Sequence, residues 1–506
     1  MDSLLLMSAT ELARRIRNRE VSAREVVQTH INRLLQVNSQ IRAVVHSRFE
    51  LALCEADRWD KQIGAKRVNN APLAGVPCTI KESFALKGMP NTAGHHKRIG
   101  LIATEDAVTV SRLRRAGAIP IGVTNTSELC MWMETNNHVY GRTNNPYDSN
   151  RIVGGSSGGE GAAVASGASP FGLGSDIGGS IRMPAFFCGV FGHKPSGGMV
   201  PGTGQYPAPS NEAWRYLTTG PLCRRAEDLM PLMQTLSGPD GRDPGCSRSN
   251  LSSPDSVRWK GLRVLLADSN GLRRVSSDIR ESQKRAATIL EQHGADVVLR
   301  EFPALERSLD LWANLMSAAA DVRFGEILTG HVSPPLVKLL WDWVMRRSIH
   351  TIPAIALTAI ERAIGKFPRN ILELRRTQNE LREELTNAIG TNGVLLFPPY
   401  TRAAPRHLMP LLTPIDWVYT AIFNVMEFPV TQAPTGLNRN GLPVGVQIVS
   451  FTGNDHLTIA VAHLLEKALG GWYPPADLAQ YLSEGHRQAE IAPKKANLAL
   501  NWTEPD

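Results

Sequence analysis

Two glycine- and serine-rich runs, GGSSGGE at 154–160 and GSDIGGSIRMPA at 174–185, lie close together in the sequence. They belong to a wider stretch, 141–202, that combines glycine, serine and proline with regularly placed apolar residues. A flexible linker lacks such apolar positions, so we predict that this stretch forms the loops of a buried site.

The sequence on either side alternates short apolar runs with helical patterns. GVPCTI at 75–80 and IPIGVT at 119–124 are typical of buried strands. Further strands are expected at 262–267, 296–300, 393–398 and 441–450, and helices at 106–117, 276–293 and 456–469. The alternation predicts an α/β fold, and core strands from distant parts of the chain indicate one interwoven sheet.

The N-terminal residues carry two capping boxes, Ser8-x-x-Glu11 and Ser22-x-x-Glu25. Each box supplies the side chains that satisfy free N–H groups at the start of a helix. We therefore expect a helical pair over residues 1–40.

Charge and cysteine content exclude several classes of protein. The chain of 506 residues carries 55 basic and 47 acidic residues, and the basic ones are scattered as short pairs, which argues against nucleic-acid binding. The six cysteines form no C-x-x-C pair, so we expect free thiols in a reducing, cytoplasmic compartment. We expect no secretion signal and no transmembrane helix, because the apolar runs are too short.

The segment 331–367 is apolar and differs from its surroundings. It contains Leu336, Trp343 and Ile352 with few charges, and its helical pattern is interrupted around Pro353. One interpretation is buried core. The other is an apolar helical cap that faces a membrane or admits substrate, with arginines at its rim.

Three residues suggest hydrolytic chemistry: Lys81 at the end of GVPCTI, Ser156 in the first glycine run and Ser180 in the second. A serine hydroxyl attacks only after a base removes its proton, and a serine–lysine arrangement can do this without histidine. The lysine must then be neutral, and burial behind apolar neighbours lowers the pKa of an amine. Ser180 is predicted to be the nucleophile, with Ser156 and Lys81 as its proton relay.

Glycines beside Ser180 leave room for main-chain N–H groups to converge on the oxyanion of a tetrahedral intermediate. The expected donors are the N–H groups of Ile177, Gly178, Gly179 and Ser180. The 13 histidines show no metal-ligand spacing such as His-Glu-x-x-His, and the adjacent His95-His96 is not interpreted as a metal pair. No metal or organic cofactor is expected to be needed for the reaction.

With these motifs, and with TNTSELCMW at 124–132 and GLPVGVQIVS at 441–450, the sequence resembles the amidase signature family over roughly residues 8–475. The resemblance implies one large mixed, twisted β-sheet sandwiched by helices, forming a catalytic domain over 41–480 and followed by a tail at 481–506. It also implies a cis peptide bond at Ser156 and an acyl-Ser180 intermediate. Ser157, Asp176 and Arg182 are expected to support the nucleophile loop, the last two as an ion pair.

Within that family the motifs look most like the fatty acid amide hydrolases of type 2, although we do not expect here the N-terminal membrane helix that the animal enzymes carry. The resemblance implies hydrophobic substrates, either fatty acid amides or aryl amides, and peripheral membrane contact through 331–367. A homodimer is expected. Candidate walls of the acyl channel are Met131, Trp132, Ile177, Trp343 and Ile352.

Two alternatives stay open. The glutamine-using component of the tRNA-dependent amidotransferase shares the same motifs, but it requires partner proteins, and the apolar 331–367 segment argues against it. A non-catalytic phosphate- or lipid-binding module would use GGSSGG as an anion nest, although the run lacks the Lys-Ser/Thr ending of a P-loop.

Overall fold

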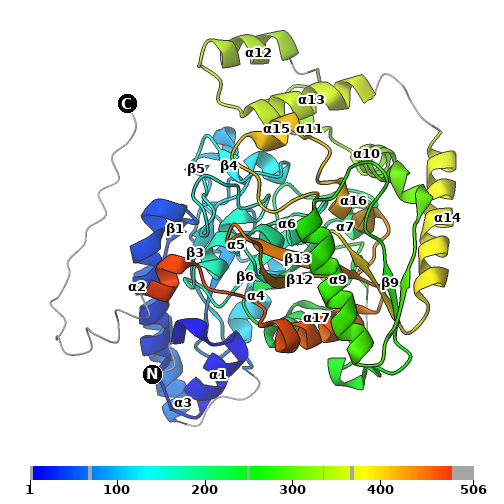
Figure 1. The fold of residues 1–506 in the computed structure, drawn as a ribbon. Helices are drawn as coiled ribbons and strands as arrows, with labels where there is room; N and C mark the ends of the chain where they lie inside the picture. Colours follow the sequence, from blue (N-terminus) through cyan, green and yellow to red (C-terminus); the bar gives the residue numbers. More distant parts are fainter. Residues whose placement is uncertain (1–3, 66–70, 248–250, 334, 365–369, 481–506) are drawn as a thin grey trace.

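A single mixed sheet of eleven strands organises the molecule (Figure 1). The computed structural model describes residues 4–65, 71–247, 251–333, 335–364 and 370–480. The strand order is β1-β3-β2-β6-β8-β7-β12-β13-β11-β9-β10. The strands are β1 (Val44–Ser47), β2 (Pro77–Lys81), β3 (Ile119–Thr124), β6 (Phe171–Asp176), β7 (Phe191–Lys194), β8 (Thr218–Cys223), β9 (Arg263–Leu266), β10 (Asp296–Leu299), β11 (Gly393–Phe397), β12 (Val430–Leu437) and β13 (Pro443–Val449).

Helices cover the sheet, as predicted for an α/β fold (Figure 1). The main ones are α1 (Ala9–Arg17), α2 (Ala23–Ile41), α3 (Phe49–Gly64), α4 (Val108–Arg115), α5 (Gly158–Ala165), α6 (Arg182–Phe187), α8 (Leu229–Leu236), α9 (Ser277–Gln292), α10 (Ser308–Ala319), α11 (Phe324–Thr329), α12 (Leu336–Val344), α13 (Ile352–Ile364), α14 (Ile371–Ile389), α16 (Val418–Val425) and α17 (Asp455–Leu469).

The local signals in the sequence are confirmed. The Ser8 and Ser22 side chains accept hydrogen bonds from the N–H groups of Glu11 and Glu25, so both capping boxes open helices. The bounds of strands β9, β10, β11 and β13 and of helices α4, α9 and α17 lie within two residues of the expected ones.

The pairing of the strands shows why the sheet is mixed. β2 lies parallel to both β3 and β6, whereas β6, β8, β7, β12, β13 and β11 follow one another antiparallel. The parallel β2 and β6 end on the same side of the sheet, which brings Lys81 and Asp176 to one edge.

The stretch 141–202 differs from the prediction that it is built from loops. It contains helices α5 and α6 and two central strands, β6 and β7. Glycine and serine disfavour strands, but here they allow close packing: a side chain on Gly172 of β6 would overlap the Glu160 carboxylate of α5. Close contact between helix and sheet therefore stabilises these strands, although their residues have a low intrinsic preference for strands.

Helices α12 and α13 stand beyond the sheet at one end of the molecule, and we call them, with the connection between them, the cap (Figure 1). Val337 and Trp341 of α12 are 84% and 63% exposed, whereas Ala354 and Ile355 of α13 are buried. The interpretation of this segment as buried core is therefore wrong for α12. Residues 334 and 365–369 of the segment, and the predicted tail at 481–506, lie outside the described residues.

None of the helices in the described ranges has both the length and the apolar character that a membrane crossing requires.

Candidate active site

Lys81 ends β2 as a fully buried lysine. Its Nζ donates hydrogen bonds to the Ser156 Oγ at 2.7 Å and to the Ser175 Oγ at 3.0 Å. Burial lowers the pKa of Lys81, and the neighbouring Cys130 and Asp176 oppose this shift only in part. The site thus favours the neutral amine that a general base requires.

Ser156 lies in the turn before α5, and its peptide bond to Gly155 is cis. The next residue, Ser157, donates its N–H to the Ser180 carbonyl at 3.2 Å, and its hydroxyl donates to the Ser175 carbonyl at 3.3 Å. The two glycine-rich runs are therefore in direct main-chain contact beside the two serines.

Ser180 lies between β6 and α6, at the edge where β2 also ends. It is 7% exposed, and within the described part of the chain its hydroxyl makes no hydrogen bond. The hydroxyl is consequently unrestrained and can turn toward an incoming substrate.

An ion pair between Asp176 and Arg182 holds the Ser180 loop, and neither side chain is exposed. The Asp176 carboxylate also accepts the N–H groups of Gly179 and Ile181, at 2.7 and 3.0 Å. Burial alone would raise the pKa of Asp176, but the Arg182 guanidinium holds it well below its usual range. The carboxylate is thus charged and fixes both ends of the loop.

The predicted oxyanion donors divide into two groups. The Gly179 N–H is donated to Asp176, so the prediction that it is an oxyanion donor is at odds with the structure. In the described residues the N–H groups of Ile177, Gly178 and Ser180 make no hydrogen bond. These three groups are free to receive an oxyanion.

The loop carbonyls are anchored away from those donors. Trp312 of α10 donates its indole N–H to the Ile177 carbonyl at 2.7 Å, and the Thr420 hydroxyl of α16 donates to the Gly178 carbonyl at 2.6 Å. Because the C=O and N–H of a trans peptide point in opposite directions, anchoring the Ile177 carbonyl turns the Gly178 N–H the other way.

Gly179 cannot be replaced in this loop. Its φ of +118° is rare for residues with a side chain, and a Cβ there would overlap the Thr420 side chain. Gly179 in the second glycine run is therefore required both for its backbone conformation and for close packing against Thr420.

Sequence reasoning missed two polar residues around Lys81. Successive side chains of a strand point to opposite faces of the sheet, so Ser175 and Asp176 of β6 face opposite ways. This alternation was the available signal for Ser175, which contacts Lys81. Glu160 of α5 is fully buried and accepts hydrogen bonds from the Thr79 and Thr124 hydroxyls at 2.5 and 2.6 Å. Burial raises the pKa of Glu160 to about 8, although the two threonine hydrogen bonds oppose this shift.

The predicted channel residues are only partly brought together. Met131 and Trp132 are half-buried and pack against the apolar cluster that contains Trp312. Ile352 is half-buried at the start of α13. Trp343 is 45% exposed on α12, which packs on α13, and its place in the acyl channel stays a prediction.

Two tryptophans that the sequence did not indicate lie beside the nucleophile loop. Trp312 and Trp417 pack edge to face with ring centroids 4.6 Å apart, and a Cβ on Gly178 would touch both. They are brought there by α10 and the turn before α16, far along the chain, so no local pattern could have identified them.

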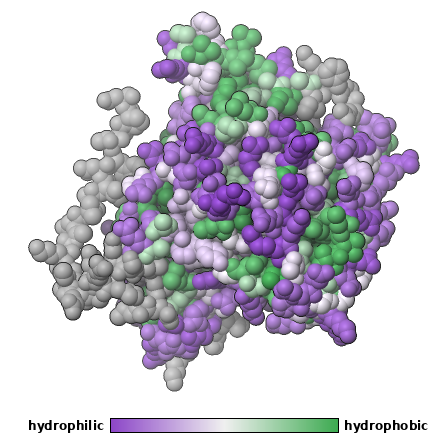
Figure 2. Space-filling model, viewed as in Figure 1, coloured by the Kyte–Doolittle hydropathy of each residue, from purple (hydrophilic) through white to green (hydrophobic). Residues whose placement is uncertain are grey.

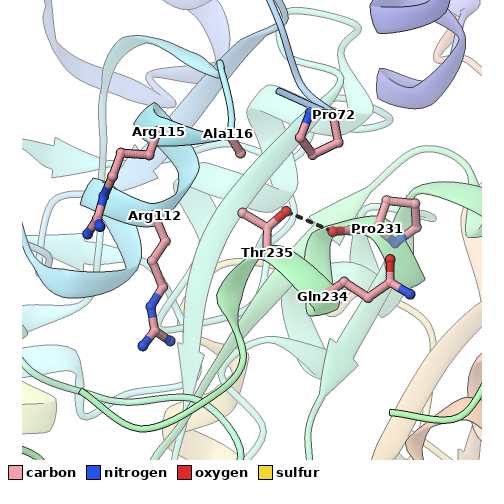
Figure 3. Close-up of a pocket in the computed structure, with 7 residues that line it drawn as sticks. All are labelled: Pro72, Arg112, Arg115, Ala116, Pro231, Gln234 and Thr235. Atoms are coloured by element: carbon pink, nitrogen blue, oxygen red, sulfur yellow. Dashed lines mark hydrogen bonds between the residues drawn. The ribbon is translucent and has the colours of Figure 1, made fainter. Parts of the chain in front are cut away.

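A separate surface pocket of about 360 Å³ lies between α4 and α8 (Figure 3). The Thr235 hydroxyl there donates to the Pro231 carbonyl, and two arginines line the opening. The lining residues are Pro72, Arg112, Arg115, Ala116, Pro231, Gln234 and Thr235. None belongs to the Lys81–Ser156–Ser180 group, so this pocket is distinct from the candidate active site.

Comparisons with known proteins identify the family of this chain. The family model described as Amidase matches residues 25–459. Human fatty-acid amide hydrolase 2 is 43% identical, over 94% of this chain and 91% of that protein. Fatty-acid amide hydrolase 2-A of Danio rerio is 44% identical, over 93% and 90%. The solved structure of 6-aminohexanoate cyclic dimer hydrolase superposes with a TM-score of 0.76 at 27% identity, covering 94% of this chain and 100% of that one.

These similarities show that the chain is an amide-cleaving hydrolase. The chain belongs to the amidase family.

Proposed function

We propose that this chain hydrolyses fatty acyl amides through an acyl-Ser180 intermediate, with Ser156 and neutral Lys81 as its proton relay. The observation that carries the proposal is the 2.7 Å contact between the Lys81 Nζ and the Ser156 Oγ inside a fully buried site. A charged lysine on the surface could not accept a proton from serine near neutral pH.

In the first half-reaction the Ser180 Oγ bonds to the amide carbon while its proton passes to Ser156 and the Ser156 proton passes to Lys81. Catalytic hydrogen bonds often tighten only when substrate binds, so the two hydroxyls would approach each other in the complex. The carbon–nitrogen bond then breaks as Ser156 returns a proton to the leaving amine and Lys81 returns one to Ser156.

In the second half-reaction the oxygen of a water molecule bonds to the acyl carbon while the water proton passes to Ser156 and the Ser156 proton passes to Lys81. The bond between that carbon and the Ser180 Oγ then breaks as Ser156 returns a proton to Ser180 and Lys81 returns one to Ser156, which releases the carboxylic acid. The oxygen charge that develops in both halves would be bound by the N–H groups of Ile177, Gly178 and Ser180. Removing one donor of this kind typically costs about 3 kcal/mol of transition-state stabilisation. The Asp176–Arg182 pair would keep these donors in place.

The substrate class is supported by the surroundings of Ser180 and by the relatives. Trp312 and Trp417 place apolar surface beside Gly178 of the nucleophile loop, and Met131 and Trp132 pack against the apolar cluster that contains Trp312. An apolar channel with one polar reaction centre is a common form for a small-molecule site. The human and Danio rerio relatives are named for their action on fatty-acid amides.

The cap supplies a surface for contact with lipid. Figure 2 shows apolar residues gathered at this end of the molecule, and Val337, Trp341 and Val344 of α12 are all more than half exposed. Arg346 and Arg347 follow directly and are exposed. Apolar side chains beside cations fit an anionic membrane surface, from which long acyl chains would be supplied.

The location and assembly of the chain are proposals of the same kind. All six cysteines are free thiols, which supports a reducing, cytoplasmic compartment. The homodimer stays a prediction that light scattering on the purified chain would test.

The test is a rate comparison over primary amides of graded acyl length, with an anilide and glutamine as further substrates. We expect kcat/KM to rise with chain length and glutamine to be turned over poorly. A preference for glutamine would favour the amidotransferase alternative, and a flat dependence on chain length would refute the fatty acyl assignment.

Membrane contact is tested separately by replacing Trp341 and Val344 with serine. We expect weaker sedimentation with anionic vesicles and slower hydrolysis of long-chain amides, while short amides are hydrolysed at an unchanged rate. Equal losses for long and short amides would contradict the proposed role of the cap.

A further inference from the structure

Three buried side chains from separate segments meet where the cap joins the body of the protein: His95, Glu128 and His350. His95 precedes η2 (His96–Arg98), Glu128 begins η3 (Glu128–Cys130), and His350 lies just before α13. Their exposed fractions are between 2% and 4%, and one ligand atom from each lies within 4.8 Å of the others.

One atom of this cluster has no partner. The His350 Nδ1 hydrogen-bonds to a Glu128 carboxylate oxygen at 2.7 Å, but the His95 Nδ1 is 4.0 Å from the same oxygen. The His95 Nδ1 is buried and makes no hydrogen bond, and its ring stacks on that of His350 with centroids 5.9 Å apart. Because buried polar atoms almost always have a partner, a buried nitrogen that lies 4.0 Å from a carboxylate oxygen, too far for a hydrogen bond, indicates that a ligand can bridge the two.

The carboxylate is prepared for a cation. Its second oxygen accepts hydrogen bonds from the N–H and hydroxyl of Thr351, at 2.8 and 2.9 Å, which fix its orientation. The group therefore offers one negative charge and two imidazole nitrogens.

We propose that His95, Glu128 and His350 bind a divalent transition-metal ion, with Zn²⁺ as the type ion, that fastens the cap to the body. Two histidines and one glutamate form a known zinc ligand set, and imidazole nitrogens select such ions over Mg²⁺ or Ca²⁺.

Binding requires only small changes. Zinc–ligand distances are about 2.0–2.2 Å, so the His350 Nδ1 and its carboxylate partner would separate slightly to admit the ion, and the His95 Nδ1, which lies 4.0 Å from the same oxygen, would move closer to it. His350 would then carry its ring hydrogen on Nε2, as a neutral ligand must. A water molecule would complete the coordination.

The ion has no part in the proposed hydrolysis. It would act on the position of the cap, because His350 directly precedes α13 while Glu128 belongs to the body. Glu128 is also close in sequence to Met131 and Trp132, so the tether lies beside the predicted acyl channel.

The full-length chain, freed of metal by a chelator, tests the proposal by equilibrium dialysis against Zn²⁺ with elemental analysis. We expect one tightly bound Zn²⁺ per chain. His95→Gln should weaken binding at least about tenfold, the lower range of losses seen when support for a metal ligand is removed. The matched control is His96→Gln, which removes an exposed neighbouring histidine and should leave the affinity unchanged.

His95→Gln is the informative variant because the His95 Nδ1 makes no hydrogen bond that the substitution could break. Its circular dichroism spectrum without metal should match that of the unaltered chain, which shows that the fold is retained. Amide hydrogen exchange at the start of α13 should slow on addition of Zn²⁺ in the unaltered chain and not in this variant. The absence of a stoichiometric ion, or equal affinity in both histidine variants, would overturn the proposal.

Discussion

Replacing Asp176 by asparagine should destabilise the protein strongly, because it breaks a fully buried ion pair. Asparagine keeps the shape of the side chain but leaves the Arg182 guanidinium without a counter-ion, which typically costs about 3–5 kcal/mol. Both carboxylate oxygens also accept main-chain or arginine N–H groups, so an NH₂ group in either position faces donors. We expect a loss of at least about 3 kcal/mol in the free energy of unfolding.

Urea denaturation at pH 7 measures that loss. The matched control is Asp148→Asn, which breaks a partly exposed ion pair with Arg151 and should cost less than about 1 kcal/mol. Combining Asp176→Asn with Arg182→Met removes both buried charges and should recover part of the lost stability. A loss below about 1 kcal/mol for Asp176→Asn, equal to that of the control, would show that the buried pair does not hold the loop.

The contribution of Asp176 to the stability of the folded chain should decrease at acidic pH. The pKa of Asp176 is lower in the folded chain than its usual 3.8, so the unfolded chain binds more protons at acidic pH. The stabilisation is fully present above about pH 4 and is lost as the pH falls below that value. The Asp176→Asn variant should therefore lose less stability than the unaltered chain on acidification.

Three further predictions concern the site. Because burial lowers the pKa of Lys81, kcat/KM should rise with pH as the amine is deprotonated. The Lys81→Met variant should lose that rise, whereas replacing Lys194, which is equally buried, should leave it in place. Because the pKa of Glu160 is raised to about 8 in the folded chain, its contribution to stability is fully present below pH 4.5 and is lost as the pH rises through 8. Calorimetry should therefore show a melting temperature that falls over this pH range in the unaltered chain, and the Glu160→Gln variant should lack this fall. Gly179→Ala should reduce activity by about 100-fold or more through displacement of the oxyanion donors, and an active, folded variant would contradict the described loop.

The sequence predicted the parts of this molecule that depend on local chemistry. Capping boxes, short apolar runs and helical periodicity each reflect interactions within a few residues, and the structure contains the corresponding helices and strands. The central strands β6 and β7 were not predicted, because the glycines within them are accommodated by close packing between helix and sheet, which local propensity does not record.

In the candidate site, too, the sequence predicted residues that belong to recognisable motifs and missed residues that only the fold brings together. The contact between Lys81 and Ser156 follows from motifs that have a chemical reason to meet. Trp312 and Trp417 were missed, because only the folding of distant helices brings them beside Gly178. The error for Gly179 has a different cause: the sequence shows that its N–H is sterically accessible but not that the Asp176 carboxylate accepts it.

Labelling with a fluorophosphonate probe, followed by peptide mass spectrometry, tests whether Ser180 is an activated nucleophile. We expect a single adduct on the Ser180 hydroxyl, its loss in Ser180→Ala, and much slower labelling in Lys81→Met, in which the contact with Ser156 is absent. An adduct on another residue, or labelling of the Ser180→Ala variant at the normal rate, would contradict the assignment of Ser180, and a non-catalytic binding module would not be labelled at all.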